Sequence, residues 1–298
     1  MQPRHILLAL FIVILWGVNF TIIKIGLQNV SPLAFGVARF ILAAFPWIFF
    51  VKPLKTPKWK VAIYSFFMFA LQFGLVFSAM KMGVSAGVSS LVIQLQAFFT
   101  IGLAVAFLGQ RPALSQYAGA ALAFSGIIVV AMNSSGDAPL LGVLMLAAAA
   151  ASWAAGNVVS RLLADDYGPD NAIGLVCWSS LFAIPPLALV GFAFDLTGFA
   201  SEFTRFDLPA IAALLFIVFS STLFAFAAWS WLMARYPVAS VAPFALLVPI
   251  FAFVSSHFVL GEPLEAWKLI AGGLVIAGLV VNQFSGRFQR TPQVEDSK

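Results

Sequence analysis

Apolar residues occur along the chain in blocks long enough to cross a lipid bilayer, and short polar connections separate the blocks. A membrane helix needs roughly 20 predominantly apolar residues, and ten stretches meet this requirement. They cover residues 6–27, 32–51, 61–80, 86–108, 113–132, 140–162, 171–192, 208–232, 238–260 and 264–285. The pattern therefore predicts an all-α integral membrane protein with ten transmembrane helices.

The composition supports a chain whose main partner is the lipid bilayer. Hydrophobic residues make up 62% of it and charged residues 9%, whereas soluble domains carry about 25% charged residues. The formal net charge of +5 does not indicate a nucleic-acid partner, because the basic residues lie at the edges of the apolar blocks.

Two parts of the chain resemble each other. Residues 85–110 align without gaps on residues 237–262, so that Leu108-Gly109-Gln110 falls on Leu260-Gly261-Glu262. Each half then holds five spans, and an odd number forces the second half to enter the membrane from the other side. We predict two five-helix repeats of inverted topology, over residues 6–132 and 140–285, followed by a cytoplasmic tail over 286–298.

The basic residues predict the orientation, because positive charge accumulates on the cytoplasmic side. With ten spans, the side that holds both termini collects Arg4, Lys52, Lys55, Lys58, Lys60, Arg111, Arg161, Arg235, Arg287, Arg290 and Lys298. The other side holds Lys24, Lys81, Arg205 and Lys268. Both termini are therefore expected to be cytoplasmic.

Polar side chains in the middle of the block 86–108 are the first candidates for a binding site. Gln94 and Phe98 are one helical turn apart, as are Gln96 and Thr100. A polar amide in hydrocarbon is costly unless it is paired. These side chains either face a substrate cavity or tie their helix to a neighbour.

Matching positions in the two halves provide further candidates. Trp16 and Asn19 lie in the first span, and Trp153 and Asn157 in the sixth. Their indole and amide groups suit substrate packing and hydrogen bonding, but a tryptophan there can also be filler. Two more polar candidates at similar depth are Gln72 and Ser221.

Arg39 is the most distinctive single candidate for a substrate-binding residue. It lies within an apolar block, where an arginine costs at least about 2.5–3.5 kcal/mol unless it is paired or hydrated. No acidic residue lies near it in sequence. We expect Arg39 either to bind a substrate carboxylate in a water-filled pathway or to cap helix ends.

Two pairs of residues in the second half are candidates for special roles, one pair for proton coupling and the other for helix bending. His257 belongs to the residue type that can carry a proton under physiological conditions, and Glu262 keeps an acid where the first repeat has Gln110. Both are candidates for proton coupling. Pro243 and Pro249 interrupt the helical hydrogen bonds of one span and are candidate hinges or static kinks.

The chain resembles the EamA type of the drug/metabolite transporter superfamily. The resemblance rests on Trp16-Gly17-Val18-Asn19 through Leu27, Pro32 with Ala38-Arg39-Phe40, Ser85-Ala86-Gly87, and the LGQ and LGE ends of the repeats. Residues 94–100, QLQAFFT, are similar to the cysteine and O-acetylserine exporter branch. The resemblance implies a ten-helix carrier in the cytoplasmic membrane in which helices 1–4 and 6–9 line a central cavity.

These observations favour a secondary transporter that exports small amino-acid-type metabolites by alternating access, with substrate and direction implied by the resemblance. The alternative of the same class is a broader drug, nucleobase or metabolite exporter. An intramembrane enzyme is a remote alternative, because the chain has no HExxH or GxSxG motif. We expect no cofactor and no metal.

Small residues on the fifth and tenth spans indicate close helix packing. Gly119 and Gly126 lie on one face of the fifth span, and Ala271 and Gly278 are their counterparts in the tenth. Such seams serve packing within one chain or between two copies, so a monomer and a homodimer both remain open.

Overall fold

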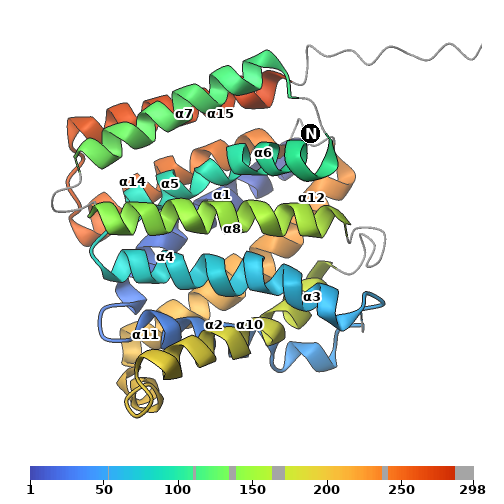
Figure 1. The fold of residues 1–298 in the computed structure, drawn as a ribbon, viewed down its shortest axis with the longest axis vertical. Helices are drawn as coiled ribbons and strands as arrows, with labels where there is room; N and C mark the ends of the chain where they lie inside the picture. Colours follow the sequence, from blue (N-terminus) through green and yellow to red (C-terminus); the bar gives the residue numbers. More distant parts are fainter. Residues whose placement is uncertain (53, 110–111, 134–138, 163–171, 237–240, 286–298) are drawn as a thin grey trace, which may run out of the picture.

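Long helices lie side by side in the computed structural model (Figure 1). The structure describes residues 1–298 except 53, 110–111, 134–138, 163–171, 237–240 and 286–298. Within the described residues every regular element is helical. The predicted tail over 286–298 and the Gln110 position lie outside the described residues.

Eight stretches in the described part of the chain are long and apolar enough to cross a membrane, and two shorter apolar helices, Phe244–Leu260 and Ala266–Asn282, follow them. The uninterrupted helices are α1 (Pro3–Gly26), α2 (Pro32–Ala44), α7 (Leu114–Met132), α8 (Leu140–Leu162), α10 (Ala172–Phe194) and α15 (Ala266–Ser285). Two short helices are η1 (Trp47–Phe49), at the end of the stretch Pro32–Phe49, and η5 (Ala200–Arg205), in a connection.

The remaining stretches are built from consecutive segments of different helical type. Two contain a π-helical segment: α3 (Lys58–Ser65), η2 (Phe66–Leu71) and α4 (Gln72–Lys81), and later α11 (Leu208–Leu215), η6 (Phe216–Phe224) and α12 (Ala225–Arg235). Two contain a 3₁₀ segment: α5 (Ala86–Val92), η3 (Ile93–Leu95) and α6 (Gln96–Leu108), and later η7 (Ala242–Leu247) and α14 (Val248–Leu260).

Local sequence explains where several helices begin and end. The hydroxyl of Ser85 accepts a hydrogen bond from the N–H of Val88 and so caps α5. α6 and α14 end at Gly109 and Gly261, with φ of 62° and 67°, a left-handed conformation that favours glycine.

The second predicted span ends earlier as an α-helix than the apolar block 32–51 suggests. α2 stops at Ala44, and Phe45 has an extended backbone. The reason is Pro46, because the ring of a proline disfavours helical backbone in the residue before it. The block continues only as the short helix η1.

Helices distant in sequence pack in pairs. α7 packs along α15, α10 along α2, and α1 along α14. α8 packs against α4 and α6, and α1 also packs against α11, η6 and α12. In Figure 1 the α7–α15 pair lies at one edge of the bundle.

The seam of small residues lies inside the monomer, between α7 and α15. A Cβ atom added to Gly119 would lie 2.6 Å from the carbonyl oxygen of Gly278, and one added to Gly278 would clash with the carbonyl oxygen of Gly119. Gly126 faces the carbonyl oxygen of Ala271 at 2.8 Å by the same measure. The predicted seam therefore joins the two helices of one chain.

We predict that Gly278→Ala lowers the free energy of unfolding by about 1–3 kcal/mol, the usual cost of overpacking. The added methyl group would meet the backbone of α7. Gly273→Ala is the matched control on the same helix, because a Cβ there has no neighbour within 4 Å. Denaturant titration of the purified protein in detergent measures both variants. Equal stability of the two would contradict the close contact.

Candidate functional site

Arg39 lies in the interior of the bundle, with 2% of its surface exposed. Its guanidinium carbon lies 3.8 Å from the ring centroid of Phe73 on α4. Nη2 donates a hydrogen bond to Thr222 Oγ1 over 3.1 Å. Nε and Nη1 have no hydrogen-bond partner among the described residues. Arg39 therefore joins α2 to two other helices and keeps donors for a further group.

The π-helical segments receive hydrogen bonds from outside their own helix. The indole Nε1 of Trp16 donates to the carbonyl oxygen of Ser221 in η6 over 3.2 Å. The hydroxyl of Ser152 on α8 donates to the carbonyl oxygen of Phe67 in η2 over 2.7 Å. Each contact supplies a donor to a backbone carbonyl where the regular α-helical pattern is interrupted.

Two other candidates on α1 and η6 are buried close to these contacts. Asn19 is one turn from Trp16 and is buried, and its Oδ1 atom has no partner among the described residues. Ser221 is buried, and its backbone carbonyl is the acceptor for Trp16. Trp16 also packs against the rings of Phe226 and Trp229 on α12.

The two glutamines contact different helices. Gln94 lies in η3 and donates to the carbonyl oxygen of Ala245 in η7 over 3.2 Å. Asn157 on α8 donates to Gln96 Oε1 and to Thr100 Oγ1, each over 3.1 Å. In this structure these polar groups thus tie their span to its neighbours, which is one of the two roles expected for them.

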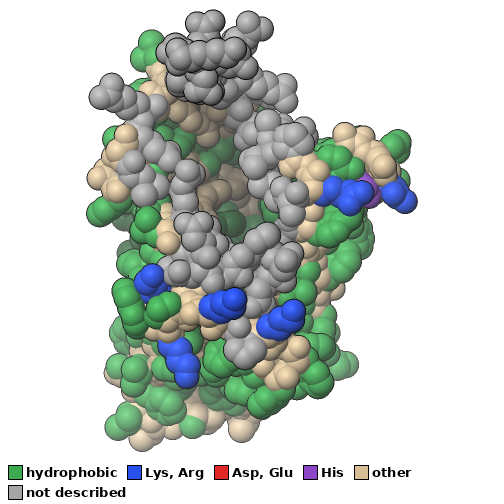
Figure 2. Space-filling view, turned by 90° about the vertical axis from the view of Figure 1, so that its right-hand side faces the viewer, with side chains coloured by type: hydrophobic (Ala, Val, Ile, Leu, Met, Phe, Trp, Pro, Cys, Tyr) green, Lys and Arg blue, Asp and Glu red, His purple; other side chains and the backbone are tan. Residues whose placement is uncertain are grey.

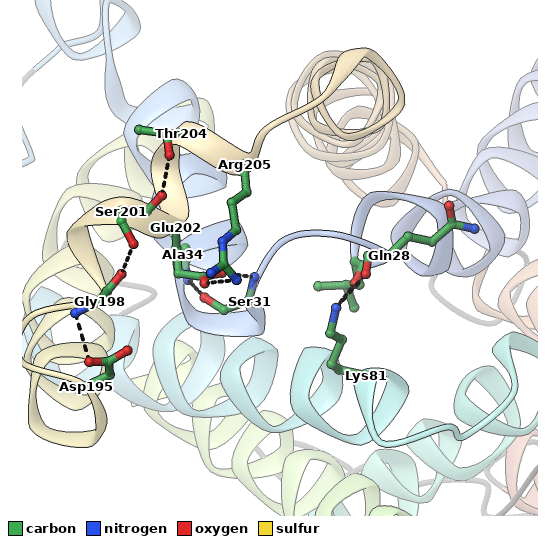
Figure 3. A network of polar contacts seen from close by, with 11 residues as sticks. Gln28, Ser31, Ala34, Lys81, Asp195, Gly198, Ser201, Glu202, Thr204 and Arg205 are labelled. Carbon is green, nitrogen blue, oxygen red and sulfur yellow. Dashed lines mark hydrogen bonds and ion pairs between the residues drawn. The ribbon is translucent and has the colours of Figure 1, made fainter.

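Polar contacts cluster at the face that carries the connections 27–31, 82–85, 195–207 and 261–265, here called the latch face. Lys81 donates to the carbonyl oxygens of Leu27 and Gln28, and Lys24 donates to that of Val84 over 2.6 Å. The lysine near the end of each of α1 and α4 thus binds carbonyls at or beyond the end of the other helix. Figure 3 shows Lys81 reaching the α1 end.

Carboxylates bind backbone N–H groups on the same face. Glu262 Oε1 accepts from the N–H of Ala86 at the start of α5 over 2.9 Å. Glu202 accepts from the N–H of Ser31 over 2.8 Å and pairs with Arg205 at 2.7 Å (Figure 3).

Asp207 is a further anchor of the latch face. The Asp207 carboxylate accepts hydrogen bonds from the N–H of Ala210 and from the side-chain amide of Asn29. Both lower the pKa of the carboxyl below its ordinary value of 3.8, and the bond from Ala210 has the larger effect. The carboxylate is therefore ionised at neutral pH, and it caps the start of α11.

The face that carries the N-terminus has a different character. Figure 2 shows Lys and Arg side chains gathered on it, a hollow between the helices, and no Asp or Glu among the described residues in view. Its described contacts include a hydrogen bond between His5 Nδ1 and the hydroxyl of Tyr236. Among the described residues no three His, Cys, Asp or Glu side chains gather into a group that could hold a metal ion.

Comparison with known proteins decides the family. The profile of the EamA-like transporter family matches the chain twice, over residues 3–132 and 140–283. The chain belongs to the EamA-like transporter family.

Relatives of this EamA-like transporter extend over its whole length. It is 36% identical over 297 residues to a probable amino-acid metabolite efflux pump of Salmonella typhimurium, with 99% of each chain covered. It is 28% identical to a probable terminal-alkyne amino-acid exporter of Streptantibioticus cattleyicolor, with 90% of each covered. A crystal structure at 19% identity shares the fold, with a TM-score of 0.63 over 96% of this chain and 100% of the other.

The other predicted site residues of the transporter lie in three environments. Gln72 is buried at the start of α4, directly after η2. Trp153 is half-buried on α8, against the main hydrophobic core. Phe98 is buried on α6 and borders a groove of about 430 Å³ between α6, α7 and α8. Phe98 thus lies beside α7 and α8, whereas the described hydrogen bond of Gln94 goes to Ala245 in η7.

The residues proposed for coupling and hinging lie towards the latch face or in the broken ninth span. His257 is exposed at the end of α14, and its Nδ1 atom lies 2.9 Å from the carbonyl oxygen of Glu262. Pro249 is buried in the first turn of α14. Pro243 is within η7, and its side chain lies outside the description.

Sequence reasoning missed three residues that shape the site. It named none of Phe73, Thr222 and Ser152 as a site residue. The available signal was weak, because a phenylalanine or a hydroxyl in an apolar helix carries no distinctive pattern. Their importance comes from contacts with residues at least 34 positions away, as in Arg39–Phe73 and Arg39–Thr222.

We predict that Gln96→Leu and Asn157→Leu are coupled by about 0.5–1.5 kcal/mol in a double-mutant cycle, the range found for hydrogen bonds between membrane helices. Unfolding in mixed detergent measures the four proteins. A second cycle that combines Gln96→Leu with Gln116→Leu is the control, because Gln116 is bonded to Asn282 instead. Additive effects in the first cycle would show that the 3.1 Å contact contributes nothing.

Proposed function

We propose that this EamA-like transporter is a secondary transporter that exports small amino-acid-type metabolites by alternating access. The observation that carries the proposal is full-length similarity, at 36% identity, to a protein named a probable amino-acid metabolite efflux pump. The terminal-alkyne amino-acid exporter relative fits the same substrate class. Buried polar groups at Arg39 and Asn19 would supply the contacts that a zwitterionic substrate needs.

The proposal includes two five-helix repeats of inverted topology, residues 6–132 and 140–285, within a total of ten spans. Segments that recur at a spacing of about 152 residues support it. The π-helical η2 and η6 occupy matching places, as do the 3₁₀ segments η3 and η7. The left-handed Gly109 and Gly261 end matching helices.

Helix packing supports the same symmetry. Exchanging the first five spans with the second five converts the α1–α14 contact into the α8–α6 contact. It also converts the contact of α1 with η6 into that of α8 with η2, and it maps the pairs α2–α10, α5–α14 and α7–α15 onto themselves. The hydrogen bonds to the π-helical segments are related in the same way. Trp16, in the first span of the first half, donates to η6 in the second half, and Ser152, in the first span of the second half, donates to η2 in the first half.

We propose that the face with the N-terminus is cytoplasmic and that the protein resides in the inner membrane. The gathering of basic side chains on that face supports this orientation (Figure 2). The latch face would then open to the outside during export. In this structure its connections are held together, so we infer a state closed on that side.

Ion coupling fits the latch face better than the bundle interior. The acidic residues of the described chain, Asp195, Glu202, Asp207, Glu262 and Glu265, lie at helix ends or in connections. Of the two candidates for proton coupling, Glu262 holds the start of α5, and its protonation would weaken that contact. His257 lies next to it and is the second candidate.

We predict that Arg39→Gln abolishes export while leaving the membrane abundance of the protein unchanged. The variant keeps hydrogen-bonding capacity but removes the charge that would bind a carboxylate. Extracellular metabolite profiling of an overexpressing strain identifies the exported compounds, and uptake of a labelled amino-acid panel into proteoliposomes confirms them. Arg235→Gln is the control, since Arg235 lies at the end of α12 and packs near Trp231. Loss of abundance in Arg39→Gln would instead favour a structural role.

We predict that Glu262→Ala opens the latch face more often. Losing a charge-assisted hydrogen bond worth ~1.5 kcal/mol would raise the open population about tenfold. A cysteine replacing the buried Ser89, in a chain with Cys177→Ser, reports the opening by its rate of labelling with a membrane-impermeant maleimide.

Glu265→Ala is the matched control for this experiment, because Glu265 pairs with Lys268 within its own segment. An unchanged labelling rate in Glu262→Ala would mean that the Glu262–Ala86 contact does not hold this face closed.

A further inference from the structure

We propose that Phe73 and Thr222 position the Arg39 guanidinium as a subsite for the carboxylate of the transported molecule. The proposal rests on the transport function proposed above and names the part of the substrate that the site recognises. Phe73 and Thr222 are positioning residues, and Arg39 is the group that would touch the carboxylate.

The Arg39 guanidinium contacts the aromatic ring of Phe73, and one of its nitrogens is hydrogen-bonded to Thr222. The guanidinium carbon lies over the ring of Phe73, 3.8 Å from the ring centroid, within the range of a cation–π contact. Thr222 accepts from Nη2. The N–H groups on Nε and Nη1 are buried and have no partner among the described residues. A planar cation with free donors is suited to a carboxylate, which accepts at both oxygens.

The π-helical segment η6 determines which backbone carbonyl the hydroxyl of Thr222 binds. The hydroxyl of Thr222 donates to the carbonyl oxygen of Ile217, five residues earlier, over 2.9 Å. A regular α-helix would direct this bond to the carbonyl three or four residues earlier. Because its proton is engaged, the hydroxyl can only accept from Arg39. This arrangement fixes Nη2 and leaves the other nitrogens to a ligand.

Two residues beside this cluster connect it to the other candidates. Phe73 follows Gln72 at the start of α4, just after η2. Ser221, which precedes Thr222, accepts the indole hydrogen bond of Trp16. Arg39 is therefore held between the two π-containing spans, and α1 approaches the same segment of η6.

The charge balance of the cluster favours an acidic ligand group. The described membrane spans contain no Asp or Glu. The described carboxylates nearest in sequence to Thr222 are Glu202 and Asp207, and both lie on the latch face with partners of their own. The described contacts of Arg39 are aromatic rings and a hydroxyl, none of which carries a negative charge. A bound carboxylate would supply the missing charge and accept from the unpaired donors.

The test compares ligands that differ only in the carboxylate. The purified full chain in detergent is titrated with the standard L-amino acids and O-acetyl-L-serine, each beside its methyl ester, and thermal stabilisation gives the affinities. We expect at least one acid to bind the wild type about tenfold more tightly than its ester, the scale of a charge-assisted hydrogen bond. Thr222→Val and Phe73→Leu should each reduce this acid-to-ester ratio, and Thr222→Ser should retain it.

The outcomes separate the subsite from the transport function. If an acid and its ester bind the wild type equally, the carboxylate subsite is wrong, although export of the same compounds can still be demonstrated. If no amino acid or ester binds, both proposals fail. If Thr222→Val and Phe73→Leu only lower the melting temperature of the ligand-free protein and leave the ratio unchanged, the two residues are structural and the positioning role is wrong.

Discussion

A positive charge in the middle of an apolar helix bundle must be compensated, and the arrangement around Arg39 follows from that constraint. Burying an arginine at the centre of a membrane helix costs at least about 2.5–3.5 kcal/mol. A desolvated cation–π contact contributes ~2 kcal/mol and a hydrogen bond to a charged group ~1.5–3 kcal/mol. Phe73 and Thr222 therefore offset part of the cost. Nε and Nη1 have no partner among the described residues, so the rest of the compensation is left to a ligand.

The same constraint applies to the backbone. A π or 3₁₀ segment shifts the hydrogen-bond pattern of its helix and leaves carbonyl groups that hydrocarbon cannot satisfy. This chain supplies donors from neighbouring helices, with Trp16 at Ser221, Ser152 at Phe67 and Gln94 at Ala245. The irregular segments are therefore joined to other helices by side chains. A movement of one span that breaks such a contact would expose a polar carbonyl, which couples the spans to one another.

Much of the helical framework is predictable from the sequence, because long apolar blocks have few other structures available in a membrane. The small-residue seam of Gly119 and Gly278 is also visible, although only contacts assign it to one chain. The break in the span from Ala86 to Leu108 was not predicted. Its counterpart after residue 240 contains prolines, but η3 contains none, so no proline signals the break in the sequence.

The candidate site was predictable in part for a related reason. Arg39, Gln94 and Gln96 stand out because polar groups are rare in apolar blocks. Phe73 and Ser152 do not stand out, since their roles depend on helices that meet only in the folded bundle. The 3₁₀ segment η3, which contains Gln94 and changes the helical rise and twist before Phe98, carries no distinctive sequence signal.

The latch face illustrates how helix ends can hold one side of such a bundle. The end of an α-helix leaves carbonyl groups unpaired, and its beginning leaves N–H groups unpaired. Lys24, Lys81 and Glu262 satisfy these groups on other helices or connections, so each contact both completes a helix end and joins two spans. Water could replace every one of these side chains when the face separates. The opening proposed for this face would therefore exchange each of these contacts for hydration.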